Sequence, residues 1–288
     1  MNQGFLVRAM PAVFVAIWST GFIVARFGMP QSPPMTFLAW RFLFSVICFG
    51  AWALIARAAW PRSRSQWLHL GATGVLMHAG YLGGVWAAVK DGMGAGLAAL
   101  LVGLQPVLTA VWISARGGEV RARQWMGLML GLAGLVLVVW QKLGLGEVHA
   151  LNLMLAFIAL VSITAGTLYQ KRFVQPCDVR TANLVQLAAA LVVTLPLALL
   201  ETEAMQLNAQ LAGAMAWSVL ALTLGGSSLL YLLIQRGAAT AVTSLLYLVP
   251  PVTALMAWVL FSEPITLLTI AGMALAAVGV SLVVRTRA

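Results

Sequence analysis

LVGLQPVLTAVW (residues 101–112) and LYLVPPVTALMAW (residues 246–258) each carry proline inside a long apolar run, and the two runs lie 145 residues apart. Proline lacks a backbone N–H and clashes with the preceding turn, so the interior of a buried helix is an unfavourable place for it. A single such proline is tolerated where neighbouring helices satisfy the freed carbonyl. Two prolines at corresponding positions instead predict a duplicated fold with an interrupted helix in each copy.

The composition identifies the solvent of this fold. Of the 288 residues, 62% are hydrophobic and 8% are charged. A water-soluble domain has roughly a quarter of its residues charged, so we expect this chain to lie in lipid. The net charge of +10 does not indicate nucleic acid, because no basic patch is interleaved with aromatic residues. The basic residues lie mainly in short loops between apolar runs.

The apolar runs have the length of membrane-spanning helices, for which about 20 residues are needed. No short segments with alternating polarity predict a β-barrel. We therefore predict an all-α integral membrane protein with ten transmembrane helices. The predicted spans are 9–28, 34–56, 66–89, 93–115, 122–141, 149–170, 181–200, 210–234, 238–261 and 265–284.

The loop charges predict the orientation, since cytoplasmic loops are enriched in Lys and Arg. With ten spans, alternate loops share a side with both termini. That side holds thirteen basic residues: Arg8, Arg57, Arg62, Arg64, Arg116, Arg121, Arg123, Lys171, Arg172, Arg180, Arg236, Arg285 and Arg287. The opposite side holds three, namely Arg26, Lys90 and Lys142, and Arg41 lies within a span. Both termini are therefore predicted to be cytoplasmic.

A shift of 145 residues aligns the two halves of the chain. GLMLGLAGLVLVV (127–139) then lies over GMALAAVGVSLVV (272–284), with six of thirteen positions identical. Matched glycines and prolines carry weight because they constrain the backbone. The predicted domains are a first repeat at 1–145 and a second at 146–288.

Each predicted repeat contains five helices, and five is an odd number. The second copy therefore enters the membrane from the opposite side, which gives two inverted-topology repeats around a central cavity. Such repeats provide a transporter with two equivalent conformations, and interrupted helices at matching places indicate the binding site. We accordingly predict that Pro106 and Pro251 bend the fourth and ninth helices beside this cavity.

Several stretches resemble a known family: WSTGFIVARFGMP (18–30), PPMTFLAWRF (33–42), GLAALLVGLQPVLTAVW (96–112) and YLVPPVTALMAWVLFSEPITLL (247–268). They are similar to EamA-type members of the drug/metabolite transporter superfamily, most of all to YddG-type exporters of aromatic amino acids. The resemblance implies a bacterial inner-membrane exporter. It also implies a cavity lined by helices one, three, four, six, eight and nine, with helices five and ten packed at one edge.

Two symmetry-related stripes of side chains predict a substrate path. Thr223, Ser227, Tyr231 and Gln235 share one face of the eighth helix, and their counterparts on the third helix are His78, Leu82, Trp86 and Lys90. Polar groups in a membrane helix normally face the bundle interior or a water-filled cavity. The alternative is that they only hydrogen-bond neighbouring helices.

The predicted cavity residues come from six helices. They are Trp18, His78, Tyr81, Trp86, Gln105, Ser162, Tyr169, Ser227, Tyr231, Ser244 and Tyr247, with Pro106 and Pro251 at the kinks. Arg41 is interpreted differently, as a long side chain that extends to the lipid headgroups. Glu119 and Glu263 precede helix starts, so we expect them to cap helices. Gly127 and Gly272 belong to small-residue motifs that we assign to helix–helix contact.

No Asp or Glu lies within a predicted span, so a buried carboxylate for strong proton coupling is not available. No metal-binding or hydrolase motif and no nucleotide-binding loop is found, so we predict neither cofactor, metal nor enzymatic activity. Recognition is expected to use hydroxyls, amides, carbonyls and aromatic faces, with broad and weak binding of neutral substrates.

We therefore predict an exporter of neutral or aromatic amino acids that works by alternating access without ATP. One alternative is a transporter of another small metabolite or a drug-like compound. The other is a membrane enzyme or scaffold on the same duplicated frame. The predicted partners are the substrate and membrane lipid; a monomer is compatible with this organisation.

Overall fold

The chain is described by a computed structural model that covers residues 3–117, 122–144, 146–226, 229 and 248–285. All regular structure in these ranges is helical. Seven helices are long and apolar enough to cross a membrane, and three shorter apolar helices cover 12–28, 249–261 and 267–282. The prediction of ten apolar spans is confirmed. The end of the eighth span and the start of the ninth fall outside the described residues.

Several spans consist of more than one helical segment. In chain order the elements are α1 (Gln3–Gly28), α2 (Pro34–Ile55), α3 (Arg64–Gly74), η1 (Val75–Gly80), α4 (Tyr81–Lys90), α5 (Ala95–Val102), α6 (Gln105–Ala115), α7 (Ala122–Gly144), α8 (Ala150–Phe173), α9 (Val179–Leu199), α10 (Ala209–Trp217), η2 (Ser218–Gly226), α13 (Val249–Phe261) and α14 (Leu267–Arg285). The third span joins α3, η1 and α4, the fourth joins α5 and α6, and the described part of the eighth joins α10 and η2.

The outer surface of the bundle is apolar, as a lipid solvent requires. Large side chains such as Ile55, Val192 and Leu199 are more than two-thirds exposed. Trp60 and Trp140, which lie near the ends of apolar spans, are also exposed, as expected of side chains at a membrane interface. The apolar exterior agrees with a multi-pass membrane protein.

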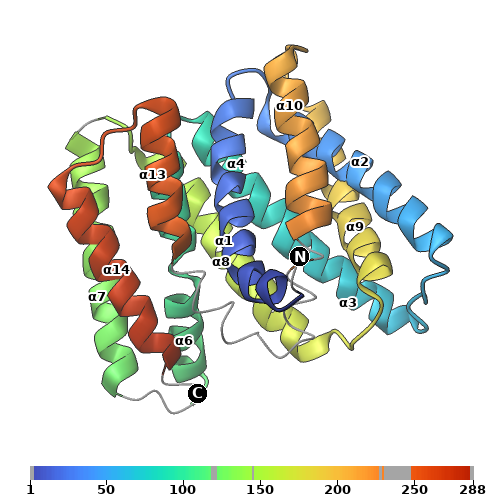
Figure 1. Cartoon of the computed structure of the whole chain (residues 1–288), viewed down its shortest axis with the longest axis horizontal. Helices are drawn as coiled ribbons and strands as arrows, with labels where there is room; N and C mark the ends of the chain where they lie inside the picture. Colours follow the sequence, from blue (N-terminus) through green and yellow to red (C-terminus); the bar gives the residue numbers. More distant parts are fainter. Residues whose placement is uncertain (1–2, 118–121, 145, 227–228, 230–247, 286–288) are drawn as a thin grey trace.

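Helices α7 and α14 pack side by side at one edge of the bundle (Figure 1). Their glycines allow the two backbones to meet: a methyl group added at Gly134 would collide with the carbonyl oxygen of Gly272. One added at Gly279 would collide with the carbonyl oxygen of Gly127. The predicted packing of helices five and ten through small residues is confirmed.

The prolines mark the starts of helices rather than bends within them. The fourth span breaks at Gly103–Leu104, and Pro106 lies in the first turn of α6. Pro250 and Pro251 lie in the first turn of α13. The first turn tolerates proline because its N–H groups have no partner within the helix. Gly103 faces Pro250, so the two matched sites pack against each other.

The third and eighth spans each contain a π-helical segment, η1 and η2. A shift of 145 residues places η1 over 220–225, inside η2. π-Helical turns inside longer helices are rare and frequently occur at functional sites. The matched pair was not predicted from the sequence.

Candidate functional site

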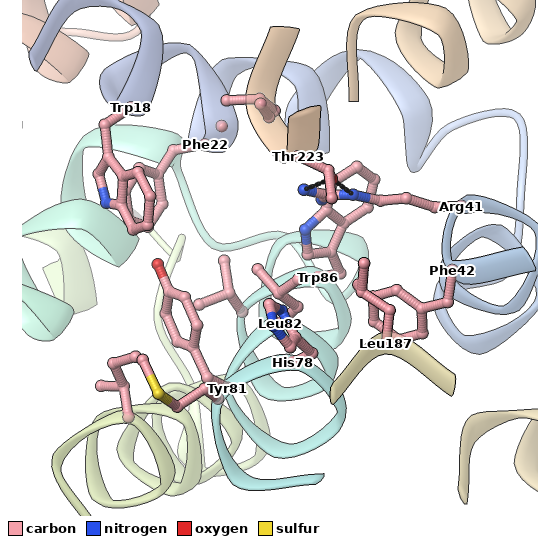
Figure 2. Close-up of a pocket in the computed structure, with 15 residues that line it drawn as sticks. Trp18, Phe22, Arg41, Phe42, His78, Tyr81, Leu82, Trp86, Leu187 and Thr223 are labelled. Carbon is pink, nitrogen blue, oxygen red and sulfur yellow. Dashed lines mark hydrogen bonds between the residues drawn. The ribbon is translucent and has the colours of Figure 1, made fainter. Parts of the chain in front are cut away.

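A cavity of about 90 Å³ lies between the two halves (Figure 2). Its walls come from α1, α2, η1, α4, α8, α9 and η2, which belong to spans one, two, three, six, seven and eight. In the described part of the chain, spans four and nine do not line this cavity, whereas spans two and seven, which the resemblance did not imply, do. The lining residues are Trp18, Gly21, Phe22, Arg41, Phe42, Met77, His78, Tyr81, Leu82, Val85, Trp86, Ile163, Leu187, Leu222 and Thr223.

One part of this central pocket is aromatic. Figure 2 shows the Tyr81 hydroxyl pointing toward Trp18 and Phe22 of α1. Tyr81 and Phe22 are buried and Trp18 is partly buried. Aromatic faces can hold apolar groups, and they attract cations electrostatically. Trp18 and Tyr81, both predicted cavity residues, line this pocket.

The opposite part of the pocket is charged. The Arg41 side chain is 6% exposed, and its Nε and Nη2 atoms donate to the Thr223 hydroxyl at 3.3 and 3.2 Å. Its guanidinium carbon lies 5.8 Å from the ring centroid of Trp86, which stacks on Phe37 at 4.5 Å. The prediction that Arg41 reaches toward lipid headgroups is wrong, because the side chain points into the bundle (Figure 2).

His78 lies in the same pocket with a partner of its own. The Gln186 side chain of α9 makes a polar contact with His78, and the His78 ring meets Phe42 edge-on at 6.2 Å. Three members of the predicted stripe on the third helix, His78, Leu82 and Trp86, line the pocket. The fourth, Lys90, does not line the pocket. At the end of the span, its Nζ donates to the Met29 carbonyl and to the Glu203 carboxylate.

Other predicted site residues lie away from the pocket. Gln105 donates to the Thr167 hydroxyl at 2.8 Å and joins α6 to α8. Ser162 packs against Gly80. Tyr169 pairs with His69 at 2.7 Å. These side chains connect helices, as in the alternative interpretation of isolated polar groups. Pro106 and Pro251 do not line the central pocket either.

Four predicted site residues fall outside the described part of the chain. They are Ser227, Tyr231, Ser244 and Tyr247. Of the predicted stripe on the eighth helix, Thr223 is described and lines the pocket.

A second, larger cavity of about 650 Å³ lies between α6 and α8. Tyr169, Trp112 and Phe173 line this cavity. Arg116 and Arg172 also line it, at the C-terminal ends of α6 and α8. These helix ends belong to the side predicted to be cytoplasmic. The volume falls within the range of roughly 300–1,000 Å³ that is typical of small-molecule sites.

The opposite end of the bundle, which we call the predicted outer end, contains loops 29–33, 91–94, 200–208 and 262–266. Here polar contacts join the two halves. Glu201 accepts hydrogen bonds from the backbone N–H groups of Met35 and Thr36 at 2.9 and 2.7 Å, at the start of α2. Lys90 Nζ lies 2.6 Å from Glu203.

Glu263 caps a helix, but not the one that follows it. Its carboxylate accepts the backbone N–H of Ala95 at 3.1 Å, at the start of α5 in the other half. The start of α14, which follows Glu263, is capped by Thr266, whose hydroxyl accepts a hydrogen bond from the backbone N–H of Thr269. Glu119 lies outside the described residues.

Ten membrane-spanning helices in two inverted halves, with a pocket of polar and aromatic side chains between them, define the architecture of a membrane transporter. The model of the EamA-like transporter family matches residues 9–140 and 150–285. The chain belongs to the EamA-like transporter family.

Its relatives are distant. The inner membrane transporter YedA of Escherichia coli, described as uncharacterized, is 28% identical over 254 residues, with 87% of this chain and 81% of YedA covered. A probable amino-acid metabolite efflux pump of Salmonella typhimurium is 27% identical over 175 residues, which cover 60% of this chain and 55% of the pump. A solved crystal structure with 19% identity matches with a TM-score of 0.67 over 95% of both chains, and supports the fold.

The structure adds residues that the sequence analysis did not select. Phe22 and Phe42 looked like ordinary apolar positions. The sequence did offer a reason to select Arg41 as a site residue, because an ionisable residue within a membrane span is a functional-site candidate by default. In the described ranges, His, Cys, Asp and Glu form no group of three or more that could hold a metal ion.

Proposed function

We propose that this transporter exports neutral and aromatic amino acids, or closely related metabolites, across a bacterial inner membrane by alternating access. The observation that carries this proposal is the central pocket, whose walls come from both halves and include both π-helical segments. A site between inverted repeats can be exposed to either side by moving one repeat against the other.

The two ends of the bundle differ in a way that supports this mechanism. Polar contacts between the halves join the predicted outer end, including those of Glu201 and Lys90. The 650 Å³ cavity lies at the predicted cytoplasmic end. We interpret the structure as a state closed to the outside, in which substrate enters from the cytoplasm.

The substrate class rests on the pocket and on a relative. The pocket offers the aromatic rings of Trp18, Phe22 and Tyr81 to an apolar side chain. A probable amino-acid metabolite efflux pump is among the relatives. The pocket is smaller than the usual range for ligand sites, so a substrate must widen it when it binds.

The test is efflux from proteoliposomes loaded with labelled L-phenylalanine, L-leucine, L-lysine or L-glutamate, without ATP. We expect gradient-driven efflux of the first two above protein-free liposomes. Trp18→Ala should reduce it, because the variant removes an aromatic wall of the pocket. Trp140→Ala is the matched control, since Trp140 is 76% exposed on the lipid-facing surface.

Three results would contradict the proposal or its site. Efflux of other metabolites without efflux of any amino acid would favour a transporter with another substrate. Folded protein that moves no tested compound would favour the non-transporting alternative, an enzyme or scaffold. An equal loss of efflux in Trp18→Ala and Trp140→Ala would mean that the central pocket is not part of the transport path.

A further inference from the structure

Arg41 is a buried cation without a described anionic partner. Two of its N–H groups are directed at a single oxygen, the Thr223 hydroxyl. That hydroxyl itself donates to the Ser218 carbonyl at 2.8 Å, so it is a neutral acceptor. None of the six acidic residues in the described ranges forms an ion pair with Arg41. The segment 227–247 contains no Asp or Glu.

A guanidinium in this position is strongly destabilising. Taking a charge out of water is costly unless an opposite charge and well-placed hydrogen bonds compensate for it. Arg41 has five N–H donors, and the described residues accept from two of its nitrogens. The Trp86 face compensates in part through a cation–π contact. The remaining capacity to bind an anion faces the central pocket.

We propose that Arg41, supported by Thr223 and Trp86, binds the carboxylate of the transported substrate. This inference deepens the proposed function and rests on it. The planar guanidinium matches a carboxylate in a bidentate arrangement. Trp18, Phe22 and Tyr81 then receive the apolar or aromatic body of the same molecule (Figure 2). The substrate class is a monocarboxylate with an apolar body.

The geometry makes the carboxylate more important than the ammonium group. In the described part of the chain, no acidic side chain lines the pocket. An ammonium group meets aromatic faces and neutral acceptors, which bind it weakly. A compound without the ammonium group should therefore still bind, whereas one without the carboxylate should not.

The counterpart of Arg41 in the other repeat provides the test variant. That counterpart is Gln186, so Arg41→Gln places in the first repeat the residue type that the second already carries. Glutamine can still hydrogen-bond the Thr223 hydroxyl but has no charge. Arg41→Lys keeps the charge and loses the bidentate geometry. Arg64→Gln removes an exposed arginine and serves as the control.

Thermal unfolding of the purified full-length protein is measured with 3-phenylpropionate, 2-phenylethylamine or L-phenylalanine. We expect 3-phenylpropionate and L-phenylalanine to raise the melting temperature of the wild type and of Arg64→Gln, and 2-phenylethylamine not to. Apparent affinity for 3-phenylpropionate should fall about ten- to hundredfold in Arg41→Gln, the loss expected for hydrogen bonds to a charged group. Arg41→Lys should lie in between.

The ligand-free variant separates a binding role from a structural one. Arg41→Gln should melt at the same or a higher temperature than the wild type, because it removes a buried charge that is only partly compensated. A fall of several degrees, together with equal binding of 3-phenylpropionate by wild type and variant, would overturn the proposal. So would equal stabilisation of the wild type by the amine. Carboxylate-dependent stabilisation without any amino acid efflux would uphold the Arg41 site while contradicting the proposed function.

Discussion

Arg41 of α2 and Thr223 of η2 meet across the two halves of the transporter at 3.2 Å. A shift of 145 residues converts this pair into Gln186 of α9 and His78 of η1, whose side chains make a polar contact. The same contact is thus built twice, in opposite orientations, and each copy ends on a π-helical segment. The two copies differ in charge, because the first repeat has arginine where the second has glutamine.

The neutral copy of this contact should support the pocket. We predict that Gln186→Leu lowers the free energy of unfolding by about 1–3 kcal/mol, since it leaves a polar atom of His78 unsatisfied, and that it also reduces transport. Asn183→Leu is the control, because the Asn183 amide donates to the Val179 carbonyl of its own helix. Thermal unfolding and efflux are the measurements. Equal effects of the two variants would contradict the symmetry argument.

The contacts at the predicted outer end should contribute unequally to closure. Glu201 accepts three hydrogen bonds from Met35 and Thr36, two of them from the N–H groups of a helix start. Charge-assisted bonds there stabilise the closed state by roughly 1–2 kcal/mol. The Lys90–Glu203 pair is partly exposed, and such pairs contribute about 0–1 kcal/mol. We predict that Glu201→Gln opens this end more than Glu203→Gln does.

A cysteine in the pocket reports this opening. A side chain at Gly21 fits, since an added Cβ would lie 3.7 Å from Leu222. Gly21→Cys is introduced with Cys48 and Cys177 replaced by alanine, and an impermeant maleimide is added from outside. The maleimide should label Gly21→Cys about tenfold faster when Glu201→Gln is also present than when Glu201 is retained. A faster reaction with Glu203→Gln than with Glu201→Gln would contradict the assignment.

The contact between α7 and α14 should not tolerate even one methyl group. In Gly134→Ala the new Cβ would meet backbone atoms of Gly272 and Ala276, which cannot rotate away. We predict destabilisation of about 1–3 kcal/mol, as for overpacked cores. Gly213→Ala in α10 meets open space and should be neutral or slightly stabilising. Thermal unfolding of both variants in the same detergent decides the matter.

The loop charges predict which end faces the cytoplasm. Arg62 lies in a loop with two further arginines nearby, and Leu207, 87% exposed, lies at the predicted outer end. In the background without native cysteines, an impermeant reagent applied to intact cells should label Leu207→Cys and spare Arg62→Cys. The reverse pattern would invert the orientation, and the structure would then be a state closed to the cytoplasm.

The fold was predictable because lipid imposes it. In a chain with 8% charged residues, only short segments are polar enough to form loops outside the membrane, so the number of spans follows from the composition. The repeat length follows from the matched glycines. The glycine motifs at 127–131 and 272–276 predicted the α7–α14 contact, because only small residues allow such an approach.

The pocket was harder to predict because lipid-facing and core-facing sides are both apolar. Hydrophobic periodicity therefore does not fix the rotation of a membrane helix about its axis. His78, Leu82 and Trp86 were selected from a polar and aromatic stripe and lie together. Arg41 was assigned to the lipid headgroups, because position along a span does not tell whether a side chain points inward.

The break at Gly103–Leu104 divides the fourth span into two rods that share α7 and α8 as neighbours but differ in their other contacts. The outer rod, α5, packs on α13 and α1, and Glu263 holds its first turn. The inner rod, α6, packs on α8 and α14 and forms a wall of the 650 Å³ cavity. No continuous backbone hydrogen-bonding ladder couples the rods, so a displacement of one is not transmitted rigidly to the other. We therefore expect the fourth span to bend at this break, so that the predicted cytoplasmic end can change shape while the predicted outer end stays closed.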